Sequence, residues 1–161
     1  VIMSDWNRTT QEITPGNGRS DLIAAIVQHI ESYHLGAVLQ DALMRIETSS
    51  EKKKKGLFGG KGDKVVVCHA IVTSNWLIWA VAGDKSGVAT LSVPLKNATI
   101  TDYALSPNYL LLPDSGLDVS GPLTGRVGVH GDPSVSAFIG LGPEPAAQKF
   151  KTVVQKARQS T

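Results

Sequence analysis

Seven short segments between residues 42 and 140 have the composition of β-strands, and they constrain the fold more than any other feature. Each is rich in β-branched, aromatic or other apolar residues, and turn-forming residues separate it from the next. No internal repeat and no regular alternation of strands with helices accompanies them. We therefore expect a mainly β fold. The expected strands are Ala42 to Ser49, Lys64 to Thr73, Trp76 to Ala82, Gly87 to Pro94, Ala98 to Ala104, Leu117 to Gly121 and Val135 to Gly140.

Two other segments have the apolar periodicity of helices. After Ser20, which can cap a helix, apolar residues recur on one helical face, so residues 20–36 are expected to form an amphipathic helix packed on the core. The last segment begins at Pro143, and proline is favoured in the first turn of a helix. Its apolar residues form one helical stripe, which consists of Ala146, Ala147, Phe150, Val153, Val154 and Ala157.

The length of 161 residues fits a single domain. Residues 1–19 contain turn signals and no sustained periodicity, so we expect a poorly ordered lead-in, followed by the helix of residues 20–36 and a β-rich domain over residues 37–161. The longest apolar run, Trp76 to Ala82, is far shorter than the roughly 20 residues of a membrane span. The single cysteine, Cys68, favours a cytoplasmic location.

Patterns typical of catalysis or metal binding fail in this sequence. Gly59-Gly60-Lys61 lacks the earlier glycine and the following Ser or Thr of a phosphate-binding loop. The four histidines and Cys68 do not have the spacing of metal ligands. No serine lies in the Gly-x-Ser-x-Gly pattern of a hydrolase nucleophile. We therefore expect no catalytic residue, no metal site and no cofactor, and the chain is not expected to be an enzyme.

Positive charge is concentrated between Glu51 and Lys64. This lysine segment holds six lysines against two acidic residues, a net +4, whereas the whole chain carries +2. Two large apolar residues lie among the lysines, so the segment suits contact with an anionic membrane surface or an acidic protein. A solvated, disordered loop is the alternative. The candidate contact residues are Lys52, Lys53, Lys54, Lys55, Leu57, Phe58, Lys61 and Lys64.

Nucleic acid is a less suitable anionic partner. Only one aromatic residue, Phe58, accompanies the lysines, and the segment has no arginine to read the edge of a base. The rest of the chain is slightly acidic, which is unlike a basic nucleic-acid-binding face.

Three local strings are similar to those of a known family. Ala70 to Trp79 is similar to its hairpin of strand, turn and strand, Ser92 to Asp102 to a strand pair, and Phe138-Ile139-Gly140 to its last strand. With these strings, the chain from about Leu35 to Arg158 resembles the pleckstrin-homology-like (PH-like) domains, especially their bacterial branch. The resemblance implies a partly open barrel of about seven antiparallel strands in two nearly orthogonal sheets, capped by the C-terminal helix.

The resemblance also makes the lysine segment the first inter-strand loop, where lipid-binding members of the family hold inositol phosphates. Val66 stands where those members carry an arginine. The leading hypothesis is a non-enzymatic PH-like binding or scaffolding module, peripheral to the membrane. The alternative is a protein-interaction or self-assembling module, a homo-oligomer, that uses its sheet edges or the helix after Ser20 and leaves the lysine segment disordered.

Overall fold

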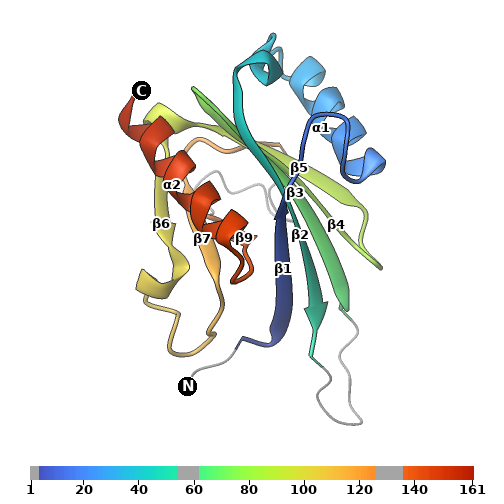
Figure 1. Ribbon diagram of the computed structural model, residues 1–161, viewed down its shortest axis with the longest axis vertical. Coiled ribbons are helices and arrows are strands. Elements are labelled where there is room, and N and C mark those ends of the chain that lie inside the picture. The colour runs from blue at the N-terminus through green and yellow to red at the C-terminus, as the bar shows by residue number, and fades with distance from the viewer. Residues whose placement is uncertain (1–3, 54–61, 126–135) are drawn as a thin grey trace.

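The computed structural model describes residues 4–53, 62–125 and 136–161. Within these ranges the chain forms two antiparallel sheets and two α-helices, so the expectation of a mainly β protein with added helices is confirmed (Figure 1). The larger sheet has the order β1 (Trp6–Glu12), β2 (Ala42–Lys52), β3 (Val65–Thr73), β4 (Trp76–Gly83), β5 (Val88–Pro94) and β8 (Thr124–Gly125). The smaller sheet has the order β6 (Thr99–Asp102), β7 (Gly116–Ser120) and β9 (Ala137–Gly140).

Each of the seven strands expected from the sequence has a counterpart, with shifted ends. Strand β2 runs three residues further than expected, to Lys52. The segment expected to continue to Ala104 is a strand only as far as Asp102, and a short 3-10 helix, η3 (Tyr103–Leu105), follows it. The described residues add two strands that the sequence does not predict, β1 and the two-residue β8.

The expectation of a poorly ordered lead-in is wrong for residues 6–12. These residues form β1, which pairs with β2 along its whole length, from Trp6 opposite Lys52 to Glu12 opposite Ile46. Thr10 is buried, and its hydroxyl lies 2.8 Å from that of Thr48 on β2. Because the inward residues Arg8 and Thr10 that follow Trp6 are polar, the strand has no apolar alternation by which it could be recognised.

The two helices cover opposite faces of the larger sheet. Helix α1 (Ser20–Ser32) packs on the outer face, as expected, although it ends four residues earlier than predicted. Leu22 and Ile26 of α1 are buried there against Ile71 and Ile78. The smaller sheet and α2 (Pro145–Gln159) lie on the other face, where Phe150 joins the main core. Neither described helix has the length and apolar character needed to cross a membrane.

The two sheets do not close into a barrel: no strand pairing joins them within the described residues. Side chains bridge the gap where β1 passes the segment after β9. The backbone amide of Thr10 donates to Glu144 Oε2 at 3.1 Å, and the amide of Gly142 donates to the Thr10 hydroxyl at 2.8 Å. Helix α2 fills one end of the space between the sheets, because Phe150 and Val154 are fully buried there.

Candidate functional site

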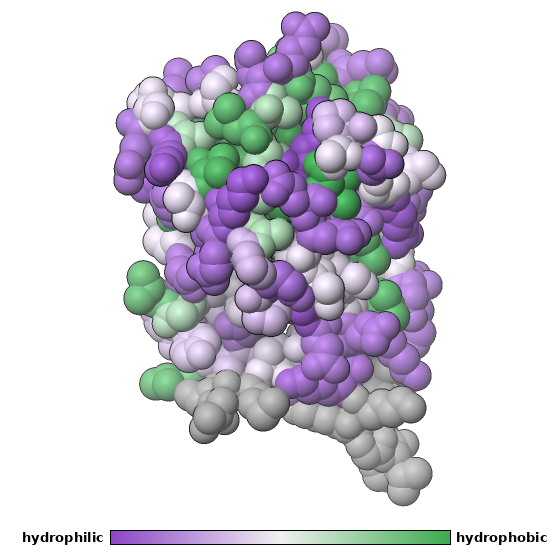
Figure 2. Space-filling model, viewed as in Figure 1, coloured by the Kyte–Doolittle hydropathy of each residue, from purple (hydrophilic) through white to green (hydrophobic). Residues whose placement is uncertain are grey.

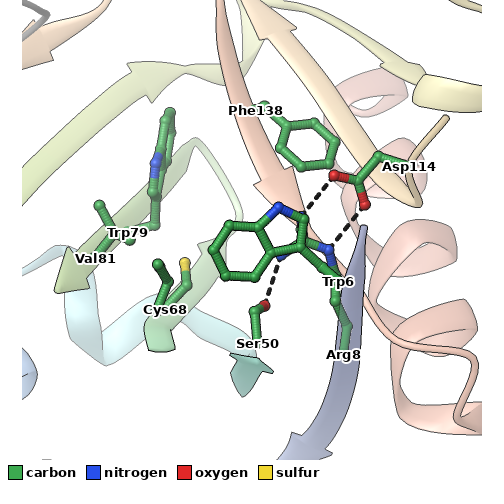
Figure 3. Close-up of a pocket in the computed structure, with 10 residues that line it drawn as sticks. Trp6, Arg8, Ser50, Cys68, Trp79, Val81, Asp114 and Phe138 are labelled. Atoms are coloured by element: carbon green, nitrogen blue, oxygen red, sulfur yellow. Dashed lines mark hydrogen bonds and ion pairs between the residues drawn. The ribbon is translucent and has the colours of Figure 1, made fainter. Parts of the chain in front are cut away.

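A pocket of about 290 Å³ opens between the two sheets, at the end where β1 begins and β2 ends (Figure 3). Aromatic and aliphatic side chains supply most of its wall, and the polar side chains come from β1, β2 and the segment before β7. A small, mostly apolar pocket with a few convergent polar groups is typical of a binding site. Its lining residues are Trp6, Arg8, Ser50, Val66, Cys68, Trp79, Val81, Asp114, Phe138 and Gly140.

Arg8 is the central polar residue of this pocket. Its guanidinium donates to both carboxylate oxygens of Asp114, from Nε at 2.9 Å and from Nη2 at 2.6 Å, and Nη1 donates to the Ser50 hydroxyl at 2.6 Å. The two side chains of the ion pair are only 10% and 16% exposed. Paired donors of this kind hold a carboxylate in a fixed orientation. Arg8 therefore ties β1 to the segment before β7.

Two aromatic rings flank the guanidinium. Arg8 Cζ lies 5.4 Å from the ring centre of Trp6 and 5.4 Å from that of Phe138, so both contacts have the geometry of cation–π interactions (Figure 3). Gly140 makes room for this arrangement. A Cβ added at Gly140 would overlap Arg8 Nη1 and would lie 2.6 Å from Arg8 Cζ.

Cys68 lies on the inner wall of the pocket, where burial makes its thiol a poor nucleophile. Burial raises the pKa of the Cys68 thiol to about 12. The thiolate is the nucleophilic form of cysteine, so Cys68 stays protonated and unreactive at neutral pH. Together with Trp79 and Val81, it makes the inner wall apolar.

Three of the expected contact residues lie near the mouth of this pocket. Lys52 ends β2 and Lys64 precedes β3, and the Lys52 amide donates to the Lys64 carbonyl at 2.8 Å. Lys52 Nζ lies 6.0 Å from the ring centre of Trp6, and the Lys53 amide donates to the carbonyl of Asp5 at 2.8 Å. The other expected contact residues lie outside the described ranges: Lys54, Lys55, Leu57, Phe58 and Lys61.

The lysine segment joins β2 to β3, so the expectation that it joins the first two strands is wrong, because β1 precedes them. Two aspartates fix the end of this segment to the turn between β4 and β5. Asp84 Oδ1 accepts from the Lys64 amide at 2.8 Å. Asp63 accepts from the Ser86 hydroxyl at 2.6 Å and from the Lys85 and Ser86 amides, and these hydrogen bonds lower the pKa of Asp63.

A second surface lies in the connection between β6 and β7, at the end of the molecule where the pocket opens. Residues 103–113, which we call the leucine loop, contain no charged residue. Four of their side chains are between 69% and 82% exposed, and these are Leu105, Leu110, Leu111 and Leu112. Hydrophobic residues project at the lower left edge of the face in Figure 2, where Figure 1 places this connection. The sequence carries a signal for this surface in the run Tyr109 to Pro113, which combines apolar residues with turn formers.

Side-chain contacts connect the leucine loop with the pocket. The Tyr103 ring lies 5.1 Å from that of Phe138 and 6.1 Å from that of Tyr109, measured between ring centres. The Tyr103 hydroxyl donates to the carbonyl of Leu112 at 2.6 Å. Since Phe138 contacts Arg8, Arg8 contacts Trp6 and Trp6 contacts Lys52, the leucine loop and the lysines lie at the same end of the molecule.

No family model, curated protein or solved structure matches this chain. In the part of the chain that the structure describes, no three His, Cys, Asp or Glu side chains are grouped so that they could hold a metal ion. The sequence directs attention to Lys52, Lys53 and Lys64. It gives no indication of Arg8 and Asp114, which come together from segments 106 positions apart.

Proposed function

We propose that this protein is a non-enzymatic, PH-like binding module that contacts an anionic membrane surface from the cytoplasmic side. The observation that carries the proposal is the position of Lys52, Lys53 and Lys64. The pairing of β2 with β3 gathers them at the end of the two sheets where the pocket opens, which we call the open end.

The order of elements supports the PH-like part of the proposal. Strands β2 to β5 follow one another in the larger sheet, β6, β7 and β9 follow in the smaller sheet, and α2 comes last. That order corresponds to seven antiparallel strands in two sheets with a C-terminal capping helix. Strand β1, helix α1 and the short β8 are additions to it.

The charges around these lysines support contact with an external anion. No ion pair between described residues uses Lys52, Lys53 or Lys64. The neighbouring carboxylates already accept hydrogen bonds from the backbone: Asp63 from the Lys85 amide in the turn after β4, and Asp84 from the Lys64 amide just before β3. A lysine near an anionic bilayer contributes about 1 kcal/mol, so several together support reversible binding.

Co-sedimentation with vesicles tests this proposal. We expect binding to phosphatidylcholine vesicles that contain phosphatidylserine, little binding to phosphatidylcholine alone, and weaker binding as salt rises. The double variant Lys52→Glu/Lys64→Glu should bind at least about thirtyfold more weakly, because it loses two attractive charges worth about 1 kcal/mol each and gains two repulsive ones.

The matched control is Lys96→Glu/Lys156→Glu, which makes the same change of charge on exposed residues near the other end of the molecule. The control should bind like the native protein. The proposal is wrong if the native protein does not bind the anionic vesicles, or if both double variants lose the same affinity.

A further inference from the structure

We propose that the leucine loop, residues 103–113, inserts its leucine side chains into the interfacial layer of the anionic membrane, an inference that rests on the proposed membrane contact. It adds an apolar contact to the electrostatic one and depends on different residues, so the two can be tested separately.

The first observation is the combination of exposure and composition in this loop. Leu110, Leu111 and Leu112 are consecutive and mostly exposed, and Leu105 is exposed with them. An exposed group of large apolar side chains indicates an interaction surface. The loop contains no charge that would oppose transfer out of water. The next residue, Asp114, is held by Arg8 on the pocket side.

The second observation is that the leucines stand on an ordered base. The Leu111 and Leu112 amides donate to the carbonyl of Asn108 at 3.1 Å and 2.8 Å, and the Tyr109 amide donates to that of Ser106 at 3.1 Å. The Tyr103 hydroxyl, at the start of the loop, donates to the carbonyl of Leu112 near its end. Because these bonds already fix the backbone of the turn, its insertion requires little further ordering.

The third observation is the arrangement of side chains around the loop. Tyr103 and Tyr109 are half-buried, and the Tyr103 ring also contacts Phe138 of the pocket. Tyrosine is enriched at the boundary between water and hydrocarbon, and lysine favours the anionic headgroups. Lys52 belongs to the same end through its contact with Trp6. Exposed leucines, half-buried tyrosines and lysines at one end of the molecule are the residue types that the successive layers of a membrane surface favour.

A second copy of this chain fits the surface less well. A symmetric dimer through the leucine loops would bring together two copies of the end that carries Lys52, Lys53 and Lys64. Like charges that face each other across an interface oppose association. The lysines that disfavour this dimer favour an anionic membrane, so we commit to the membrane as the partner.

An environment-sensitive fluorophore provides the direct test. We would attach it at Leu111→Cys in a Cys68→Ala background, since Cys68 is the only native cysteine. The matched control carries the same fluorophore at Leu43→Cys, an exposed leucine at the start of β2, far from the open end. With vesicles that contain phosphatidylserine, we expect a blue shift and quenching by brominated acyl chains at position 111, and neither effect at position 43.

The triple variant Leu110→Ser/Leu111→Ser/Leu112→Ser separates this inference from the proposed function. At high salt, where the lysine contribution is screened, its binding to the same vesicles should be at least about tenfold weaker than that of the native protein, because burial of even one leucine is worth about that factor. The single variant Leu43→Ser should bind like the native protein.

Each outcome bears on one proposal or on both. If the leucine variant binds like the native protein while Lys52→Glu/Lys64→Glu does not, the insertion is refuted and the electrostatic contact stands. If the native protein binds neither type of vesicle, both proposals are refuted. If light scattering without vesicles shows an oligomer that the leucine variant abolishes, a second copy covers the loop and the insertion is wrong.

Discussion

Breaking the ion pair between Arg8 and Asp114 should destabilise the protein strongly. Asp114→Asn leaves a guanidinium that is 10% exposed without its carboxylate partner. Removing one partner of a buried ion pair typically costs about 3–5 kcal/mol. Because the pair touches solvent slightly and Ser50 still accepts from Arg8 at 2.6 Å, we expect a loss of about 3 kcal/mol, at the lower end of that range.

The reverse change should cost less. In Arg8→Met the carboxylate of Asp114 keeps two hydrogen bonds, from the Ser4 hydroxyl at 3.1 Å and the Ser115 amide at 2.8 Å, so we expect a loss of about 2 kcal/mol. The double variant Arg8→Met/Asp114→Asn leaves no unpaired charge. Its loss should therefore be about 2–3 kcal/mol rather than the sum of the single losses, which gives a coupling energy of about 2–3 kcal/mol.

Urea unfolding of the four proteins measures this coupling through the free energy of unfolding. The matched control is the cycle between Glu12 and Lys149, whose atoms also lie 2.9 Å apart but whose side chains are 45% and 57% exposed. Its coupling should stay below about 1 kcal/mol, as for other exposed pairs. A coupling between Arg8 and Asp114 that is no larger than this control would refute the view that burial makes the pair strong.

Three further expectations concern single positions. Gly140→Ala should lower the free energy of unfolding by about 1–3 kcal/mol in urea, because its Cβ overlaps the Arg8 guanidinium; an unchanged midpoint would contradict this. Cys68 should resist a thiol reagent at neutral pH until the protein unfolds, because burial raises its pKa to about 12; rapid labelling of the folded protein would count against burial. Burial lowers the pKa of His29 from its usual value of 6.5. As the pH drops below 6.5, His29 therefore binds a proton in the unfolded chain before it does so in the folded protein. The free energy of unfolding should therefore fall as the pH drops through that value, and His29→Gln, measured by urea unfolding, should reduce this slope.

The elements with regular apolar patterns could be predicted from the sequence. The stripe that contains Phe150 and Val154 identifies α2, and Leu22 and Ile26 identify α1, because these residues pack on the core. Strand β1 could not be found in this way. Its inward residues Arg8 and Thr10 are satisfied by polar partners from distant parts of the chain, and no local pattern reveals such partners.

The candidate site was predicted only in part, for a similar reason. The charge of the lysine segment is a local property, so Lys52, Lys53 and Lys64 could be singled out before the fold was known. The pocket depends on tertiary contacts, since Arg8, Asp114 and Phe138 come from three separate segments. The leucine loop lies between these cases, because its uncharged, leucine-rich composition is local but its exposure is not.

Strand β1 also has a consequence for how the chain reaches this structure. Along its length it is held by partners far ahead in the sequence: Arg8 by Asp114, Thr10 by Gly142 and Glu12 by Lys149. Contacts between distant parts of a chain form slowly, because the intervening loop must close first. During synthesis these three contacts therefore form only after Asp114, Gly142 and Lys149 have been made, although β2 can pair with β1 earlier. We expect the amides of β1 to gain protection from hydrogen exchange after those of β3 and β4 in refolding.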